Sequence, residues 1–121
     1  MVASVLSNAA GNRALAAVFG VKGLYLALHL EVPPPDGSGE EVSAGGYARQ
    51  PISFTTPAGK GCASSNAQSF AAMPACTVKA ISVWTALSGG DMLLALLLAP
   101  PLVVAASARV SVAVGDVAVS L

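Results

Sequence analysis

The chain has 121 residues, enough for one domain with a hydrophobic core. Hydrophobic residues make up 55% of it and charged residues only 10%, whereas an ordinary soluble domain carries about 25% charged residues. A lone domain of this size cannot bury so much apolar side chain, so we expect a membrane or protein partners to cover part of its surface. The net charge is zero, which gives no electrostatic attraction for nucleic acid or an anionic bilayer, and we expect no nucleic-acid partner.

Segment 92–106, MLLALLLAPPLVVAA, is the candidate for a membrane span. It is shorter than the roughly 20 apolar residues that a spanning helix needs, and Pro100 and Pro101 interrupt it, so each half has the length of a strand. The first residues lack the basic leader of a signal peptide. We therefore expect no membrane partner, and a protein made in the cytoplasm that enters an assembly.

The N-terminal part of the chain predicts a helix. Segment 3–19 has apolar residues at loosely helical spacing, and Gly20 is a natural stop. Gly11 weakens this helix, so a short helix or one with a frayed start is expected. We divide the chain into an N-terminal helix or arm, residues 1–20, and a single β domain, residues 21–121.

The first predicted strand is GLYLALHL, residues 23–30. Strict alternation places its leucines on the core side, and Tyr25, Ala27 and His29 on the other face. The next segment, 31–46, is rich in proline, glycine and acidic residues and predicts a loop. Its carboxylates lack the spacing of a calcium loop, so we interpret them as solvated.

From residue 47 the chain alternates again. Tyr47 and Arg49 fall on one face of a predicted strand and Gln50 on the other, and we expect the Tyr-Arg pair to be exposed. Pro51 cannot donate to a ladder, which predicts an edge strand or a bulge. Arg49 suits a bidentate contact with a neighbour's carboxylate. We predict that Tyr47, Arg49 and Gln50 form an interface.

Further strands are predicted in the second half. AQSFAAM is a weak strand, TVKAISVW a stronger one, and MLLALLLA an apolar strand buried on both faces, or on one face plus a subunit contact. Near the end, two alternating valine runs flank Gly115-Asp116, which suits a type II′ hairpin. Many short strands with turn-rich connections and one helix predict an all-β, antiparallel β-sandwich, jelly-roll-like, with a short N-terminal helix.

The sequence offers few residues that could form a catalytic site. His29 is the single histidine; it would need a serine or cysteine beside it and an orienting acid, and we interpret it as a surface or interface residue. Cys62 and Cys76 have no zinc spacing, so we expect two reduced thiols; a disulfide is the alternative if the protein works outside the cell. We predict no catalytic residue, no cofactor and no metal site.

The order of these pieces resembles a family of small tailed-phage virion proteins, usually labelled phage tail fibre protein. The resemblance covers about residues 12–121. Its most specific elements are Glu41-Val42-Ser43, the segment GGYARQ at 45–50, Ser88-Gly89-Gly90 and Gly115-Asp116. It implies a non-enzymatic structural protein of the virion.

A compact domain with an aliphatic surface is too small to hold a fibre shaft and tip. We therefore expect a capsid decoration, or cement, protein on the capsid surface, with the major capsid protein as partner and a homotrimer as its oligomeric state. The alternatives are a tail-tip or tail-fibre component and, from another class, a carbohydrate-binding module for host attachment.

Overall fold

A computed structural model describes residues 6–121. Its elements in chain order are α1 (Asn8–Phe19), β1 (Leu24–His29), β2 (Gln50–Ile52), β3 (Gly61–Ala63), β4 (Gln68–Phe70), β5 (Cys76–Trp84), β6 (Met92–Val104), β7 (Val110–Val112) and β8 (Ala118–Ser120). In this part of the chain, no helix has the length and apolar character to cross a membrane.

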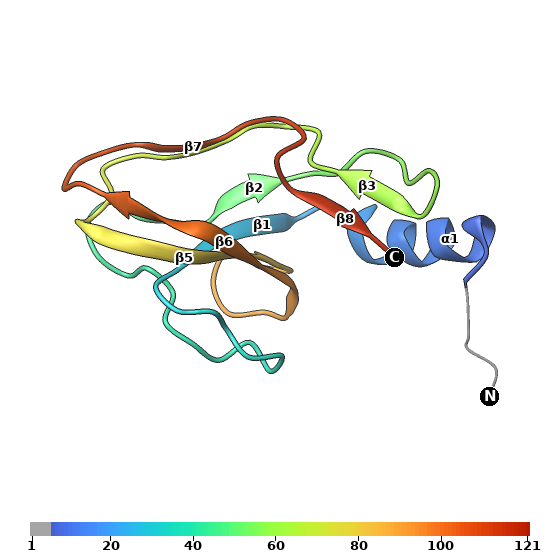
Figure 1. The fold of residues 1–121 in the computed structure, drawn as a ribbon, viewed down its shortest axis with the longest axis horizontal. Helices are drawn as coiled ribbons and strands as arrows, with labels where there is room; N and C mark the ends of the chain where they lie inside the picture. Colours follow the sequence, from blue (N-terminus) through green and yellow to red (C-terminus); the bar gives the residue numbers. More distant parts are fainter. Residues whose placement is uncertain (1–5) are drawn as a thin grey trace.

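The strands form two layers. A four-stranded antiparallel sheet has the order β2-β1-β5-β6, and two antiparallel ribbons, β4-β7 and β3-β8, run along one side of it (Figure 1). α1 lies alongside β3, next to the end of β8, at one end of the molecule (Figure 1). This arrangement confirms the predicted all-β antiparallel sandwich with a short N-terminal helix.

α1 is positioned by its caps and by two buried side chains. The Ser7 hydroxyl accepts a hydrogen bond from the Ala10 N–H at 3.1 Å, and the Gly20 N–H caps the C-terminal end. Leu15 and Phe19 lie in the same core as the strands. The predicted stop at Gly20 is confirmed; residues 3–5 of the predicted helix lie outside the described residues. The predicted boundary at residue 20 falls at the end of this helix.

Both faces of β1 are buried. Leu24, Leu26 and Leu28 face the ribbons, as predicted. Ala27 and His29, predicted on the opposite and less covered face, are also buried. The reason is the loop 31–46: its Gly37 lies against the Trp84 ring on this second face, and its Glu41 forms a backbone bridge with His29 at the edge of β1.

β6 is a long strand at the edge of the sheet. It continues through Pro100 and Pro101, which were expected to divide it, because the pairing with β5 jumps at this point from Leu97 to Leu102. This irregularity accommodates two residues without an N–H donor. β6 is only partly buried, and Leu97 is 64% exposed.

The predicted hairpin at Gly115-Asp116 is wrong. β7 pairs with β4, and β8 pairs with β3, so the two strands never pair with each other. The turn runs from Ala113 to Asp116, whose N–H donates to the Ala113 carbonyl at 3.1 Å. Gly115 has φ +85° at the second central position, which suits a type II turn. Such a turn lets the chain leave one ribbon and enter the other.

Candidate functional site

A network of polar side chains lies inside the molecule, beneath the loop 31–46. At its centre the Arg49 guanidinium meets the Glu41 carboxylate with two parallel hydrogen bonds, Nε to Oε2 at 3.0 Å and Nη2 to Oε1 at 2.9 Å. Arg49 is 7% exposed, and the Glu41 side chain is 25% exposed. The bidentate partner predicted for Arg49 is therefore present, but it belongs to the same chain.

Arg49 also holds the turn between β5 and β6. Its Nη1 donates to the backbone carbonyls of Ala86 at 2.9 Å and Gly89 at 2.8 Å. The guanidinium carbon lies 4.2 Å from the centre of the Trp84 ring, a cation–π contact. Through four hydrogen bonds and one ring contact, Arg49 thus joins Glu41 of the loop 31–46, Trp84 of β5 and the turn between β5 and β6. The prediction that Arg49 lies on an exposed face is wrong.

Tyr47 and Gln50 complete the predicted interface set. The Tyr47 hydroxyl donates to Glu41 Oε2 at 2.6 Å and accepts from the Leu28 N–H at 3.1 Å, while its ring stacks on Phe70. Tyr47 therefore points inward, contrary to the prediction. Gln50 is half-buried, and its amide donates to the Ala48 carbonyl. A contact of these residues with another subunit stays a prediction.

A second part of the network centres on His29, which is 1% exposed and so is not the surface residue predicted. Its Nε2 and the Ser82 hydroxyl lie 2.5 Å apart, and the Trp84 indole N–H donates to the same hydroxyl at 2.6 Å. The His29 and Trp84 rings are stacked. Nδ1 of His29 is buried and has no hydrogen-bond partner among residues 6–121.

The burial of these groups shifts their titration. Burial lowers the pKa of His29 because it removes the imidazolium from water, and the nearby Glu41 carboxylate offsets this only in part. Burial alone would raise the pKa of Glu41, but the hydrogen bonds from Arg49 and Tyr47 outweigh it and hold that pKa below its ordinary value. Burial and the Glu41 carboxylate both raise the pKa of Tyr47. At neutral pH the network therefore holds an ionised Glu41 and a neutral His29.

The structure brings a serine and an acid to the histidine, as a hydrolytic triad would require. Ser82, however, is as buried as His29, and its hydroxyl already accepts the Trp84 N–H. Both Glu41 oxygens are bound by Arg49 and Tyr47. A nucleophile must meet its substrate, and this serine has no surface to offer one. The network is suited to holding the loop on the sheet.

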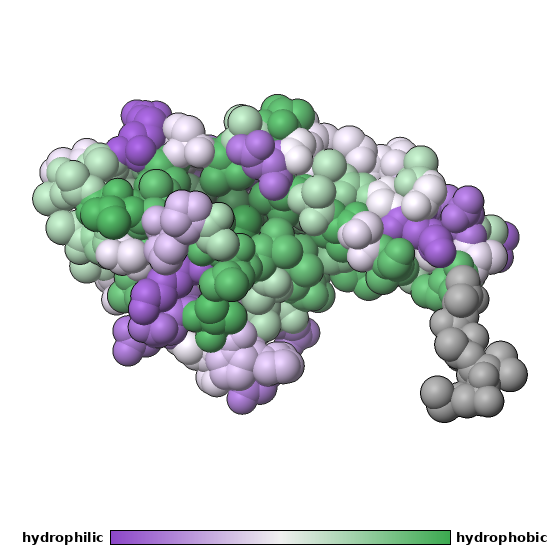
Figure 2. All heavy atoms as spheres, viewed as in Figure 1, coloured by the Kyte–Doolittle hydropathy of each residue, from purple (hydrophilic) through white to green (hydrophobic). Residues whose placement is uncertain are grey.

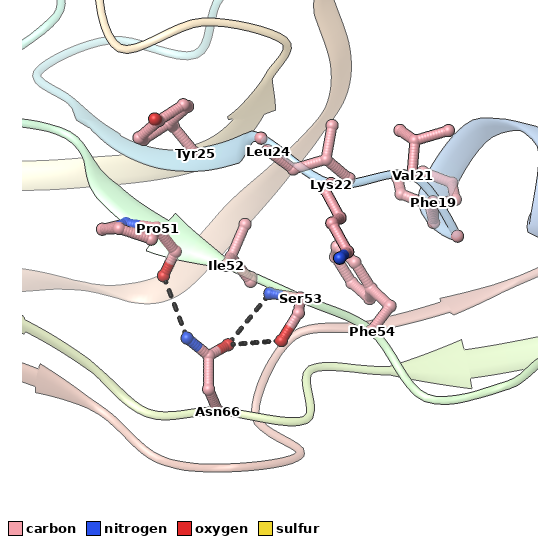
Figure 3. A pocket seen from close by; sticks show the side chains of 12 residues that line it. Phe19, Val21, Lys22, Leu24, Tyr25, Pro51, Ile52, Ser53, Phe54 and Asn66 are labelled. Atoms are coloured by element: carbon pink, nitrogen blue, oxygen red, sulfur yellow. Dashed lines mark hydrogen bonds between the residues drawn. The ribbon is translucent and has the colours of Figure 1, made fainter.

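The surface carries shallow pockets instead. One of about 390 Å³ lies between the end of α1 and β2, and Figure 3 shows the side chains that line it, among them Phe19, Lys22, Tyr25 and Phe54. Across it, Asn66 accepts from the Ser53 N–H at 2.9 Å and donates to the Pro51 carbonyl at 3.1 Å. Its ionisable side chains are an amine and a phenol, which do not make a nucleophile and base pair.

Cys62 and Cys76 are free thiols, in agreement with the prediction of reduced cysteines. Burial raises the pKa of both, which keeps them protonated and poorly reactive. Among residues 6–121 no group of histidine, cysteine and acidic side chains could hold a metal ion.

Sequence reasoning missed Glu41, Ser82 and Trp84 as members of the network. The signal that could have found Glu41 is its place in the segment EVSAGGYARQ, eight residues before Arg49, because an ion pair needs its opposite charge nearby. Ser82 and Trp84 lie on the same face of β5, which alternation does show, but nothing in the sequence says that a loop covers this face.

Comparison with known proteins gives one family. The family model described as "Podophage GP4 fiber I protein gp80" matches residues 2–120. No curated protein matches the chain.

Proposed function

The chain belongs to the family described as Podophage GP4 fiber I protein gp80, and from this premise we propose that it is a non-enzymatic component of the phage fibre apparatus. Family membership makes it a phage structural protein of the virion. The observation that carries the proposal is the extent of the match, which spans α1 and all eight strands. The family match thus covers the sandwich as a whole.

The chemistry of the domain supports a structural role. The three side chains nearest to a catalytic triad are already engaged: His29 and Ser82 bond each other, and Glu41 bonds Arg49 and Tyr47. Among residues 6–121, ten large hydrophobic side chains are exposed, and the chain carries few charges. Such a surface is suited to lasting contacts with other proteins.

Capsid decoration is the second candidate. In this reading the protein is a homotrimer that binds the major capsid protein on the capsid surface and stabilises the shell by mass action, since a ligand stabilises whichever state it binds. The observation that favours it is the single short sandwich, with no shaft among residues 6–121. The family description favours the fibre reading.

The test is to separate heads from tails of purified virions and to quantify this protein in each fraction. The fibre proposal predicts a few copies per particle, all in the tail fraction, and particles without the protein that fail to adsorb to host cells. Hundreds of copies in the head fraction, with earlier DNA release on heating when the protein is missing, would replace it with the decoration reading. Glycan binding by the purified protein would point to direct host attachment within the fibre reading.

A further inference from the structure

The outer edge of β6 lacks the protection that edge strands usually carry. From Met92 to Ala99 the strand has no charged or polar side chain. Within the part of the chain that the structure describes, only β5 pairs with β6. Natural sheet edges are blunted by charges, prolines or bulges, because a bare apolar edge recruits another strand. In β6 the prolines protect only the segment beyond Ala99.

β6 is also apolar on both faces. Leu94 and Leu96 lie on the face that packs against the ribbons, and they are only half-buried. Ala95 and Leu97 lie on the opposite face; Ala95 is half-buried, and Leu97 is mostly exposed. An edge strand that met water on one face would alternate with polar residues. Figure 2 shows hydrophobic side chains gathered over the region of β6.

The other edge of the sheet is closed. β2 is three residues long, and Pro51 in its centre has no N–H to donate. Asn66 occupies the polar groups on its outer side, through the Pro51 carbonyl and the Ser53 N–H, as Figure 3 shows. The sheet can therefore be extended only at β6. A chain of copies joined head to tail, β6 to β2, is excluded.

We propose that Met92–Ala99 of β6 pairs antiparallel with the same segment of a second copy, which joins the two four-stranded sheets into one. A two-fold axis normal to the sheet relates the copies, so one residue of each strand faces its own counterpart. The middle of the segment puts Ala95 or Leu96 at this position. This inference concerns the isolated chain; it goes beyond the fibre proposal, which sets no oligomeric state, and it excludes the homotrimer of the decoration reading.

The chemistry of the edge favours a second copy over another partner. The segment Met92–Ala99 has no charge that a partner could match. Its best complement is therefore an uncharged strand with apolar residues on both faces, and a second copy of β6 is such a strand. An eight-residue strand is about 26 Å long. A stable interface buries about 800 Å² on each partner, which a bare edge does not reach.

Two apolar grooves beside β6 supply the remaining area. One, of about 320 Å³, lies where Leu93 and Leu94 meet Val18 and Leu121. The other, of about 300 Å³, lies between β6 and β7 and includes Leu102. In an antiparallel pair, the N-terminal end of one β6 lies beside the C-terminal end of the other. The groove at one end of each strand therefore faces the exposed residues at the opposite end of the partner strand.

The experiment measures the oligomeric state of the purified chain by sedimentation, from 1 to 100 μM. We expect a dimer, and we expect Leu97→Lys to weaken it at least ten-fold, because the lysine ammonium would be buried against an apolar strand. Val114→Lys is the matched control, since Val114 is also well exposed but lies in the turn after β7. It should leave the dimer unchanged.

A second variant tests the pairing even if Leu97→Lys folds poorly. Ala95→Cys, in a background with Cys62→Ser and Cys76→Ser, should be joined to its counterpart by a short bismaleimide, whereas Val114→Cys in the same background should not. A monomer at 100 μM, a trimer, a dimer that Leu97→Lys leaves intact, or failure of the Ala95→Cys cross-link would overturn the proposal.

Discussion

Replacing Glu41 with glutamine removes the charge that faces Arg49 and keeps the shape of the side chain. The guanidinium would then remain buried with its two backbone carbonyls but without a counter-charge. Removing one partner of a buried ion pair costs about 3–5 kcal/mol of unfolding free energy. Because the Glu41 side chain is a quarter exposed, water screens part of the loss, and we expect about 3 kcal/mol, the lower end of that range.

Urea denaturation measures this cost directly. The chain has one tryptophan, Trp84, which lies under the Arg49 guanidinium and therefore reports on the network by its fluorescence. Glu31→Gln is the matched control, because Glu31 forms an exposed ion pair with Lys79, and such pairs contribute about 0–1 kcal/mol. If Glu41→Gln costs no more than Glu31→Gln, the network does not hold the loop and the reasoning fails.

The same pair of proteins gives a dependence on pH. The pKa of Glu41 is lowered in the folded state, so its contribution is complete above the unfolded pKa, near 4.5, and is lost as pH falls through the folded pKa. The difference in unfolding free energy between wild type and Glu41→Gln should therefore be constant from pH 7 to pH 5 and shrink in more acid solution. A difference that grows as the solution is acidified would contradict this assignment.

Three further predictions concern other residues. The folded protein keeps His29 neutral below its ordinary pKa of 6.5 while the unfolded chain binds the proton, so the unfolding free energy should fall as pH drops from 7 to 5, and His29→Gln should flatten this slope in urea titrations at each pH. A thiol reagent should modify buried Cys62 and part-buried Cys76 only slowly in the native protein and both at once in urea; rapid native reaction of Cys62 would refute its burial. Gly45→Ala should cost about 1–3 kcal/mol of unfolding free energy by thermal denaturation, because Gly45 has φ +62° and a Cβ there would lie 2.8 Å from the Ala72 carbonyl; an unchanged melting temperature would show that the loop yields.

Strands with a clear residue pattern in the sequence could be predicted well. β1 follows from leucines at every second position, β5 from its β-branched residues, and the edge position of β2 from Pro51. β3 was not predicted, because it is three residues long within a turn-rich segment. Its pairing with β8 joins distant parts of the chain, and local propensity carries no such information.

The candidate site could be predicted only in part. Alternation says which residues share a face, and it correctly groups His29 with Ala27 and Tyr25. It does not say what covers that face. Arg49 and His29 were placed at the surface because a loop rich in glycine and proline gave no sign that it would fold onto the sheet, and this tertiary packing decides their burial.

The central pairing of the sheet has a kinetic consequence. β1 and β5 lie side by side, yet the whole segment from Leu30 to Ala75 separates them along the chain. Closing a loop of that length costs about 3 kcal/mol of entropy before any contact repays it. The Arg49 cluster needs both strands in place, so it can form only after this barrier has been crossed. Substitutions at Glu41 should accordingly speed unfolding while leaving the refolding rate nearly unchanged. The polar cluster would then set the unfolding rate, and with it the lifetime of the native state.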